Sequence, residues 1–128
     1  MAAGLDLLDT TAVPKGVTIC NVFGHDPAIA EYVIMTMLVL THRLFDAVAT
    51  FRAGSWVASP QFGGGPPHGE VMGSTIGIIG YGRIGREVAE RAAGLRCRVL
   101  AANRSPFADP APAETVFPLA ELDRMLPL

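Results

Sequence analysis

Hydrophobic and polar positions along the second half of the chain change period twice, and the changes outline a strand, a helix and a second strand. Residues 75–79 (TIGII) are apolar and largely β-branched, which predicts a strand covered on both faces in a parallel sheet. Residues 83–93 have helical periodicity. The apolar residues at this spacing are Ile84, Val88 and Ala92, and Leu95 continues the spacing just beyond the predicted helix. Residues 97–102 are again apolar and predict the second strand.

Two side chains and one glycine support the predicted helix of residues 83–93. Glu87 and Arg91 are one turn apart, so they are predicted to form an ion pair on the helix surface. Gly94 is predicted to end the helix, since glycine is the usual residue after a last helical turn.

The first half of the chain predicts a short strand followed by helices. Residues 17–22 contain enough alternating β-branched side chains for a strand. A helix is predicted over residues 27–42, with Asp26 capping its free N–H groups and Pro27 at its first position. A further helical piece runs through Phe51 and stops at Gly54.

Glycine and proline mark the connections. Residues 59–69 (SPQFGGGPPHG) are predicted to be an exposed connector, because three successive glycines and two prolines support neither a helix nor a strand ladder. Residues 105–114 are predicted to be a proline-broken loop, and residues 119–126 a short amphipathic helix.

Composition narrows the class of protein. The chain has 128 residues, 50% of them hydrophobic and 17% charged, with a formal net charge of −2. This balance predicts one globular domain with no nucleic-acid partner. Cys20 and Cys97 have no metal-binding or disulfide spacing, which favours a reducing, cytoplasmic setting and no metal site. The most apolar run, residues 28–40, is too short and too polar to span a bilayer, and no signal peptide is recognisable.

No histidine is predicted to be catalytic. His25 precedes a predicted helix, His42 lies near the end of that helix, and His68 falls in the glycine-rich connector. A structural or solvent-exposed role is expected for each. Tyr32, Met35, Met37 and Phe45 are likewise expected to be core or subunit-contact residues because of their helical spacing.

The candidate chemistry lies in the sequence GYGRIG between the first strand and its helix. Gly80 permits a tight turn, Gly82 allows the main chain to approach a pyrophosphate, and Gly85 lets the helix pack close to the sheet. The phosphate would meet unpaired amides at the positive end of the helix dipole. The alternative is that these glycines form only a compact corner between strand and helix.

The end of the second strand indicates which dinucleotide is preferred. An acidic residue about 20 positions beyond the glycines usually binds the ribose 2′-hydroxyl of NAD, whereas this chain has Asn103, Arg104 and Ser105 there. The missing carboxylate and the added cation favour NADP over NAD, unless Arg104 is simply a solvated loop charge. Arg83 either adds a contact to phosphate or points to water. The predicted cofactor-binding residues are Gly80, Tyr81, Gly82, Arg83, Ile84, Gly85, Asn103, Arg104 and Ser105.

With these motifs in place, residues 73–105 closely resemble the D-isomer-specific 2-hydroxyacid dehydrogenases, especially glyoxylate and hydroxypyruvate reductase-like members that use NADPH. The likeness extends upstream, where Asn21 to Gly24 (NVFG) stands for the family's NVPG and Ala28 to Tyr32 (AIAEY) for its AVAEH. Trp56 completes a G-x-W motif, and Ser74 replaces the lysine of the usual GKT.

The resemblance implies an α/β fold: a partial Rossmann-type doubly wound parallel sheet over residues 27–128, preceded by a short remnant of a substrate domain over residues 1–26. It also implies hydride transfer between nicotinamide and the 2-carbon of a small 2-hydroxy or 2-keto acid, and a homodimer. The family's catalytic arginine, glutamate and histidine belong to segments downstream of those present here, so no catalytic residue is predicted and the chain looks truncated at both ends.

Three functions remain open from the sequence. The chain is a partial NADP- or NAD-linked oxidoreductase, inactive alone; or a noncatalytic dinucleotide-binding or regulatory module; or a truncated gene product without independent function.

Overall fold

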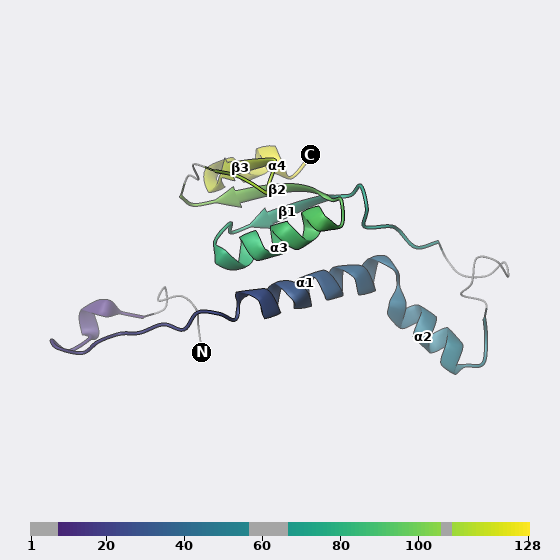
Figure 1. The fold of residues 1–128 in the computed structure, drawn as a ribbon, viewed down its shortest axis with the longest axis horizontal. Helices are drawn as coiled ribbons and strands as arrows, with labels where there is room; N and C mark the ends of the chain where they lie inside the picture. Colours follow the sequence, from purple (N-terminus) through teal and green to yellow (C-terminus); the bar gives the residue numbers. More distant parts are fainter. Residues whose placement is uncertain (1–7, 57–66, 106–108) are drawn as a thin grey trace.

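The core of the molecule is a parallel sheet of three strands with helices on both faces (Figure 1). The computed structural model describes residues 8–56, 67–105 and 109–128. The helices and strands, in chain order, are η1 (Thr10–Ala12), α1 (Asp26–Thr41), α2 (Leu44–Arg52), β1 (Thr75–Ile79), α3 (Arg83–Gly94), β2 (Arg98–Asn103), β3 (Thr115–Pro118), η3 (Leu119–Glu121) and α4 (Leu122–Met125). The predicted α/β class is confirmed.

The sheet has the order β1–β2–β3, with every neighbouring pair parallel. β1 pairs with β2 from Thr75 opposite Arg98 to Ile79 opposite Ala102. The sequence analysis assigned no element to β3, which has only four residues and follows a proline-rich segment. The position of β3 beside β2 provides the hydrogen-bonded edge that such a short segment needs.

Two apolar clusters cover opposite faces of β2. Val99 and Ala101 pack toward α3 with Ala89 and Ala92, whereas Leu100 and Ala102 pack toward Met125 of α4. β2 is therefore buried on both faces. The same expectation was wrong for β1, where Ile79 is 61% exposed, because within the described residues β1 pairs on one side only and α4 approaches it at Gly77.

α1 lies against α3 on the side away from the sheet, and the two helices begin at the same end of the molecule (Figure 1). The predicted helix is confirmed, but its cap is not Asp26. His25 is the N-cap residue without a side-chain cap bond, and Asp26 and Pro27 are the first two helical residues. The Asp26 carboxylate bonds to Arg83 instead of capping backbone amides.

α2 confirms the second predicted helical piece, and Gly54 follows it with a φ of +78°. Among the described residues, no single helix is long and apolar enough to cross a membrane. α1 and α2 reach that length only as a pair, with a bend of 60° between them.

The strand predicted over residues 17–22 is absent: these residues have no regular structure, and Val17 and Val22 are exposed. A strand requires a hydrogen-bonded neighbour, and no segment of the described chain pairs with this one. Most of the predicted connector at residues 59–69 lies outside the described residues, as do residues 106–108 of the predicted loop.

The ends of α3 and of the chain differ in detail from the prediction. Gly94 is the last residue of α3 as expected, but the left-handed residue that follows the helix is Arg96, with a φ of 61°. Residues 119–126 form a 3₁₀ turn followed by one α-helical turn, not a single helix. The Glu87–Arg91 ion pair is confirmed, at 2.5 Å between Oε2 and Nη1.

Candidate functional site

The chain leaves β1 through a turn that only glycine makes without strain. Gly80 has a φ of +97°, in the left-handed region where a side chain would be unfavourable. Its N–H donates to the Ala102 carbonyl at 2.8 Å, which extends the pairing of β1 and β2 by one residue. The turn is thus fixed to the carboxyl end of the sheet.

Gly82 and Gly85 differ in what surrounds them. A Cβ built on Gly85 would lie 2.2 Å from the Gly80 carbonyl oxygen and 3.3 Å from Cγ2 of Ile78, so α3 packs here at a distance that only glycine allows. A Cβ on Gly82 would meet nothing within 4 Å. The second glycine is therefore not required by packing inside the chain, and the space beside it is open.

The start of α3 presents its amides to this space. Arg86 donates to the Gly82 carbonyl at 3.0 Å and is the first N–H with a partner one helical turn back. The amides of Arg83, Ile84 and Gly85 precede it and lie at the positive end of the helix dipole. Backbone N–H groups in this position bind anions such as phosphate. The side chain of Ile84 is half-buried.

Tyr81 anchors the turn from inside the core. Its side chain is fully buried, at 0% exposure, and its hydroxyl donates to the Pro110 carbonyl at 2.8 Å while accepting from the Ala113 N–H at 3.0 Å. Its position inside the glycine motif placed it among the predicted cofactor-binding residues. The structure shows that its ring ties the turn to the segment before β3.

Asn103 joins the turn to the end of β2. Its Oδ1 accepts from the Tyr81 N–H at 3.0 Å, and its Nδ2 donates to the Ser105 carbonyl at 2.9 Å. This bridging role was not recognised in the sequence, where Asn103 was noted only for replacing an acid. An amide can make both bonds at once, whereas a carboxylate has no N–H to donate to Ser105.

A pocket of about 360 Å³ lies at the carboxyl ends of β1 and β2. Ligands of open α/β sheets bind at this edge. Four of the predicted cofactor-binding residues line the pocket together with the last residue of β1, one residue of β2 and one of η3. They are Gly80, Asn103, Arg104 and Ser105, with Ile79, Ala102 and Leu119. The structure therefore brings the glycine turn and the end of β2 into one site.

Arg83 points away from this pocket toward the start of α1. Its Nε and Nη2 lie 3.1 and 3.0 Å from Oδ2 of Asp26, and its guanidinium carbon lies 4.8 Å from the centre of the Phe23 ring. Burial alone would raise the pKa of Asp26. The hydrogen bond and the charge of Arg83 outweigh that effect, so the pKa of Asp26 lies below its usual value.

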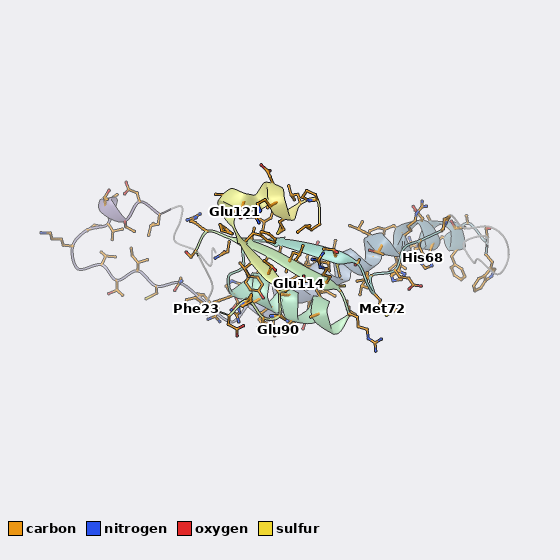
Figure 2. The ribbon with its side chains drawn as sticks, turned by 90° about the horizontal axis from the view of Figure 1, so that it is seen from above. Phe23, His68, Met72, Glu90, Glu114 and Glu121 are labelled. Atoms are coloured by element: carbon orange, nitrogen blue, oxygen red, sulfur yellow. The ribbon has the colours of Figure 1, made fainter. Side chains whose placement is uncertain are left out.

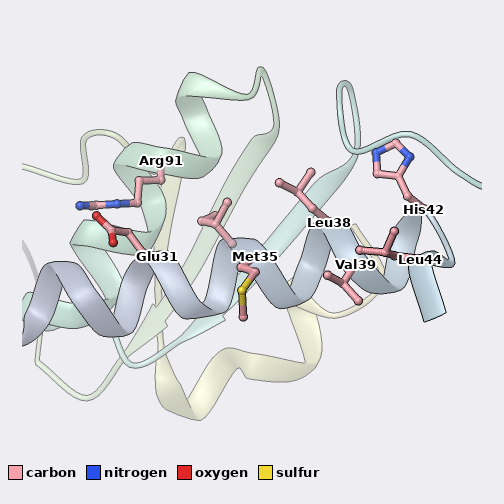
Figure 3. A pocket seen from close by; sticks show the side chains of 8 residues that line it. Glu31, Met35, Leu38, Val39, His42, Leu44 and Arg91 are labelled. Atoms are coloured by element: carbon pink, nitrogen blue, oxygen red, sulfur yellow. The ribbon is translucent and has the colours of Figure 1, made fainter. Parts of the chain in front are cut away.

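A second hollow, of about 550 Å³, lies along α1 and the start of α2, with Arg91 of α3 at its edge (Figure 3). It is lined mainly by aliphatic side chains such as Met35, Leu38 and Val39, with Glu31 and Arg91 at one end. It lacks the several convergent polar groups of a small-molecule site. This groove is therefore a packing surface rather than a second candidate for chemistry.

His42 and His68 lie far from the glycine turn, whereas His25 is half-buried next to Asp26, the residue that contacts Arg83. His25 precedes α1, and the rings of His42 and His68 are 5.1 Å apart at the other end of that helix. Figure 2 shows His68 at the end of the molecule opposite Phe23, which contacts the first residue of α3. Within the described ranges, no group of three or more His, Cys, Asp or Glu side chains is placed to hold a metal ion.

Comparison with known proteins identifies the family. Residues 34–128 match the family description "D-isomer specific 2-hydroxyacid dehydrogenase, NAD binding domain". The chain belongs to this family. The match includes β1, the glycine turn, α3 and β2, so the candidate site falls inside the NAD-binding domain of the 2-hydroxyacid dehydrogenases.

Individual proteins are also similar to this chain in sequence. The chain is 33% identical to a hydroxypyruvate reductase of Thermotoga maritima over 94% of its own length and 36% of the relative's. It is 35% identical to a glycerate dehydrogenase of Methylorubrum extorquens, over 78% of the chain and 33% of that protein. The chain thus spans about a third of the length of these curated relatives.

Solved structures of the family confirm the Rossmann-like fold. A D-isomer specific 2-hydroxyacid dehydrogenase family protein from Aeromonas salmonicida superposes with a TM-score of 0.79 at 27% identity, covering 97% of this chain and 38% of that one. An NAD-dependent formate dehydrogenase from Staphylococcus aureus, solved in complex with NAD, superposes with a TM-score of 0.64 at 28% identity, covering 77% and 28%.

Proposed function

We propose that this chain holds a dinucleotide cofactor at the carboxyl ends of β1 and β2, as the cofactor-binding part of an oxidoreductase that acts on small 2-hydroxy or 2-keto acids. The diphosphate rests on the amides of Arg83, Ile84 and Gly85, and the adenosine ribose lies in the pocket formed with Asn103 to Ser105. The contrast between Gly85, which packing requires, and Gly82, which packing does not require, is the observation that carries this proposal.

The bound cofactor would supply hydride at its nicotinamide ring. The residues of this chain bind and orient the cofactor. The polar side chains that line the pocket are those of Asn103, Arg104 and Ser105, and its lining includes no histidine, aspartate, glutamate, lysine or cysteine that could serve as a general acid or base. General acid–base catalysis supplies roughly 10²- to 10⁴-fold in rate, so we propose that the 128-residue polypeptide binds cofactor without turning over substrate.

Turnover is tested on purified polypeptide free of host reductases. NADPH or NADH is mixed with glyoxylate or hydroxypyruvate, the acids that appear in the names of relatives of this chain. The absorbance of the reduced nicotinamide is then followed. We expect no consumption above the rate without protein. Steady consumption that scales with the amount of polypeptide would show that a catalytic group is present in this chain.

We also propose that the cofactor is NADP in preference to NAD. Residues 103–105, at the end of β2, contain no carboxylate, and the exposed Arg104 and Ser105 line the pocket where a 2′-phosphate would lie. A hydrogen bond to a charged group contributes roughly 1.5–3 kcal/mol, which corresponds to about tenfold or more in affinity.

Calorimetric titration with each dinucleotide tests this preference. The parent chain is expected to bind NADP more tightly than NAD, and Arg104→Gln should weaken NADP binding while leaving NAD binding unchanged. Arg52→Gln, on the distant helix α2, is the matched control. Tighter binding of NAD than of NADP by the parent chain contradicts the preference.

The exposed side of α1 and α2 supports a homodimer as part of the same proposal. Tyr32, Leu40 and Phe45 are 66%, 65% and 73% exposed and lie along the helices that form the apolar groove. Burial of such side chains against a second copy is favourable by roughly 25 cal/mol per Å² of apolar area. Sedimentation should show a dimer that Phe45→Glu dissociates, whereas Leu126→Glu, at an exposed position after α4, leaves it intact. A monomeric parent chain contradicts this part.

The proposed boundary between the two parts of the chain lies at Asp26, with residues 1–26 as a substrate-domain remnant and 27–128 as the partial cofactor domain. The exposed, irregular residues 14–20 and the packing of α1 on α3 support this division. Limited proteolysis should cleave before α1 first.

The free thiols of Cys20 and Cys97 agree with the proposed cytoplasmic location, which cell fractionation tests.

A further inference from the structure

Arg83, the first residue of α3, is bound by a carboxylate that belongs to another helix. Oδ2 of Asp26 accepts from Nε of Arg83 and lies 3.0 Å from its Nη2. Asp26 is 4% exposed, whereas 64% of the Arg83 side chain is accessible. The buried partner of this pair therefore lies in α1 and the accessible partner in the glycine turn.

The surroundings of Asp26 and Arg83 favour the paired state. A buried carboxylate without its partner is costly, so Asp26 resists the loss of Arg83. The ring of Phe23 lies against the guanidinium carbon at 4.8 Å and adds a cation–π contact. Both contacts pull the side chain toward the start of α1 and away from the amides of its own helix.

We propose that Asp26 is a positioning residue that restrains Arg83, so that the bound diphosphate is held by backbone amides and the Arg83 guanidinium contributes little to cofactor affinity. This inference rests on the proposed dinucleotide site. It explains why an arginine inside the glycine motif contacts the start of α1 and does not line the pocket. It also makes cofactor affinity depend on the first turn of α1, which lies outside the pocket.

A four-member set of chains tests the restraint: the parent, Asp26→Asn, Arg83→Gln and the double variant, each titrated with NADP. Asp26→Asn removes the charge that holds Arg83, and we expect NADP binding to tighten on the order of fivefold, the size of one partly exposed ion pair. Affinity should also fall more steeply with added salt, because one more cation then contacts the ligand. Arg83→Gln alone should change affinity little.

The double variant separates restraint from a general charge effect. If Asp26 acts through Arg83, adding Asp26→Asn to the Arg83→Gln chain should not change NADP affinity. Asp26→Glu, which keeps the carboxylate in an otherwise parental chain, should bind NADP with parental affinity. Asp46→Asn is the matched control, since it removes the same charge and also breaks an ion pair, between Arg43 and Asp46 in α2. It should leave NADP affinity unchanged.

A measurement on the parent chain guards against a variant that does not fold. The NMR signal of the Arg83 side-chain Nε–H should stay in place on addition of NADP, while the backbone amide signal of Arg83 moves. A large shift of the Nε–H signal would mean that Arg83 moves onto the phosphate, and it overturns the inference. So does an equal gain from Asp26→Asn with and without Arg83. If the parent chain binds no dinucleotide at all, the proposed function fails together with this inference.

Discussion

Single atoms decide the role of each glycine in the turn after β1. At Gly85 the Gly80 carbonyl oxygen occupies the place of a Cβ, whereas at Gly82 that place is empty and open to solvent. The same residue type therefore serves packing at one position and ligand access at the other. Substitution by alanine separates these roles, because it adds one carbon atom at each position.

Gly82→Ala should leave the fold intact and weaken cofactor binding. The backbone at Gly82 is extended, with φ −85° and ψ −156°, which alanine adopts, and the new methyl group meets no protein atom. We expect the free energy of unfolding to change by less than about 0.5 kcal/mol. Dinucleotide affinity should fall on the order of tenfold or more, because the methyl group occupies the approach of the diphosphate. Unchanged affinity in a folded variant would place the diphosphate elsewhere.

Gly85→Ala should destabilise the chain directly. A methyl group 2.2 Å from a backbone oxygen forces α3 away from β1, and overpacking of this kind costs about 3 kcal/mol or more. Urea denaturation followed by circular dichroism measures the loss. Gly94→Ala is the control, since no atom lies within 4 Å of its Cβ position, and a gain of roughly 0.5–1 kcal/mol is expected there. Equal stabilities of the two variants would contradict the close approach of helix and strand.

Tyr81→Phe tests the anchor beneath the turn. The variant keeps the buried ring but leaves the Ala113 N–H without the acceptor it has at 3.0 Å. An unsatisfied buried donor costs about 1–3 kcal/mol. Thermal unfolding should report this loss, whereas NADP affinity of the folded variant should stay near the parental value. A drop in affinity without a drop in stability would instead give the hydroxyl a direct role at the ligand.

At the scale of helices and strands, the local sequence pattern was sufficient to predict an element wherever the packing of the folded chain favours the same structure. β1, α3 and β2 were predicted within about a residue at each end, because apolar period, glycine position and burial all agree there. β3 was missed since its strand state depends on the neighbouring edge of β2. The false strand at residues 17–22 has the opposite cause: its β-branched side chains favour a strand, but no described segment pairs with it.

The candidate site shows the same limit. The turn at Gly80 and the close packing at Gly85 follow from spacing alone, and the structure brings this turn and the end of β2 to one pocket. The sequence did not reveal that Asn103 bridges the turn to Ser105, or that Arg83 pairs with Asp26, because 57 positions separate that pair along the chain. Contacts between distant segments leave no periodic signal.

Asp26 links α1 to α3, and this link should depend on pH. Its pKa lies below the usual 3.8 because Arg83 stabilises the charged form, despite the opposing effect of burial. The unfolded chain therefore binds a proton at a higher pH than the folded chain does. The stabilisation is complete above pH 3.8 and is lost as pH falls through the folded value.

Melting temperatures of the parent chain and of Asp26→Asn, measured from about pH 2 to pH 6, isolate this contribution. The parent should be the more stable above about pH 4, and the difference should shrink as the solution is acidified. Asp9 and Glu114, whose pKa values are also lowered, remain in both chains and cancel in the comparison. A difference that stays constant with pH would mean that the two side chains do not interact as a charged pair.

In the whole molecule, the glycine turn and the apolar groove lie at different positions. The glycine turn lies at the carboxyl edge of the sheet, whereas the apolar groove lies along α1 and the start of α2, with Arg91 of α3 at its edge. α3 lies between the sheet and α1 (Figure 1). Cofactor binding and assembly with a second copy can therefore occur together. This arrangement predicts that dinucleotide affinity is the same in the monomeric variant Phe45→Glu as in the parent chain.

Amide NMR of the isotope-labelled chain during titration with NADP locates the cofactor most directly. The largest shifts should fall on the amides of residues 82–85 and 103–105, with little change in α2. Shifts concentrated along α1 and α2, or none at saturating NADP and NAD, would contradict the assignment of a dinucleotide site to this turn.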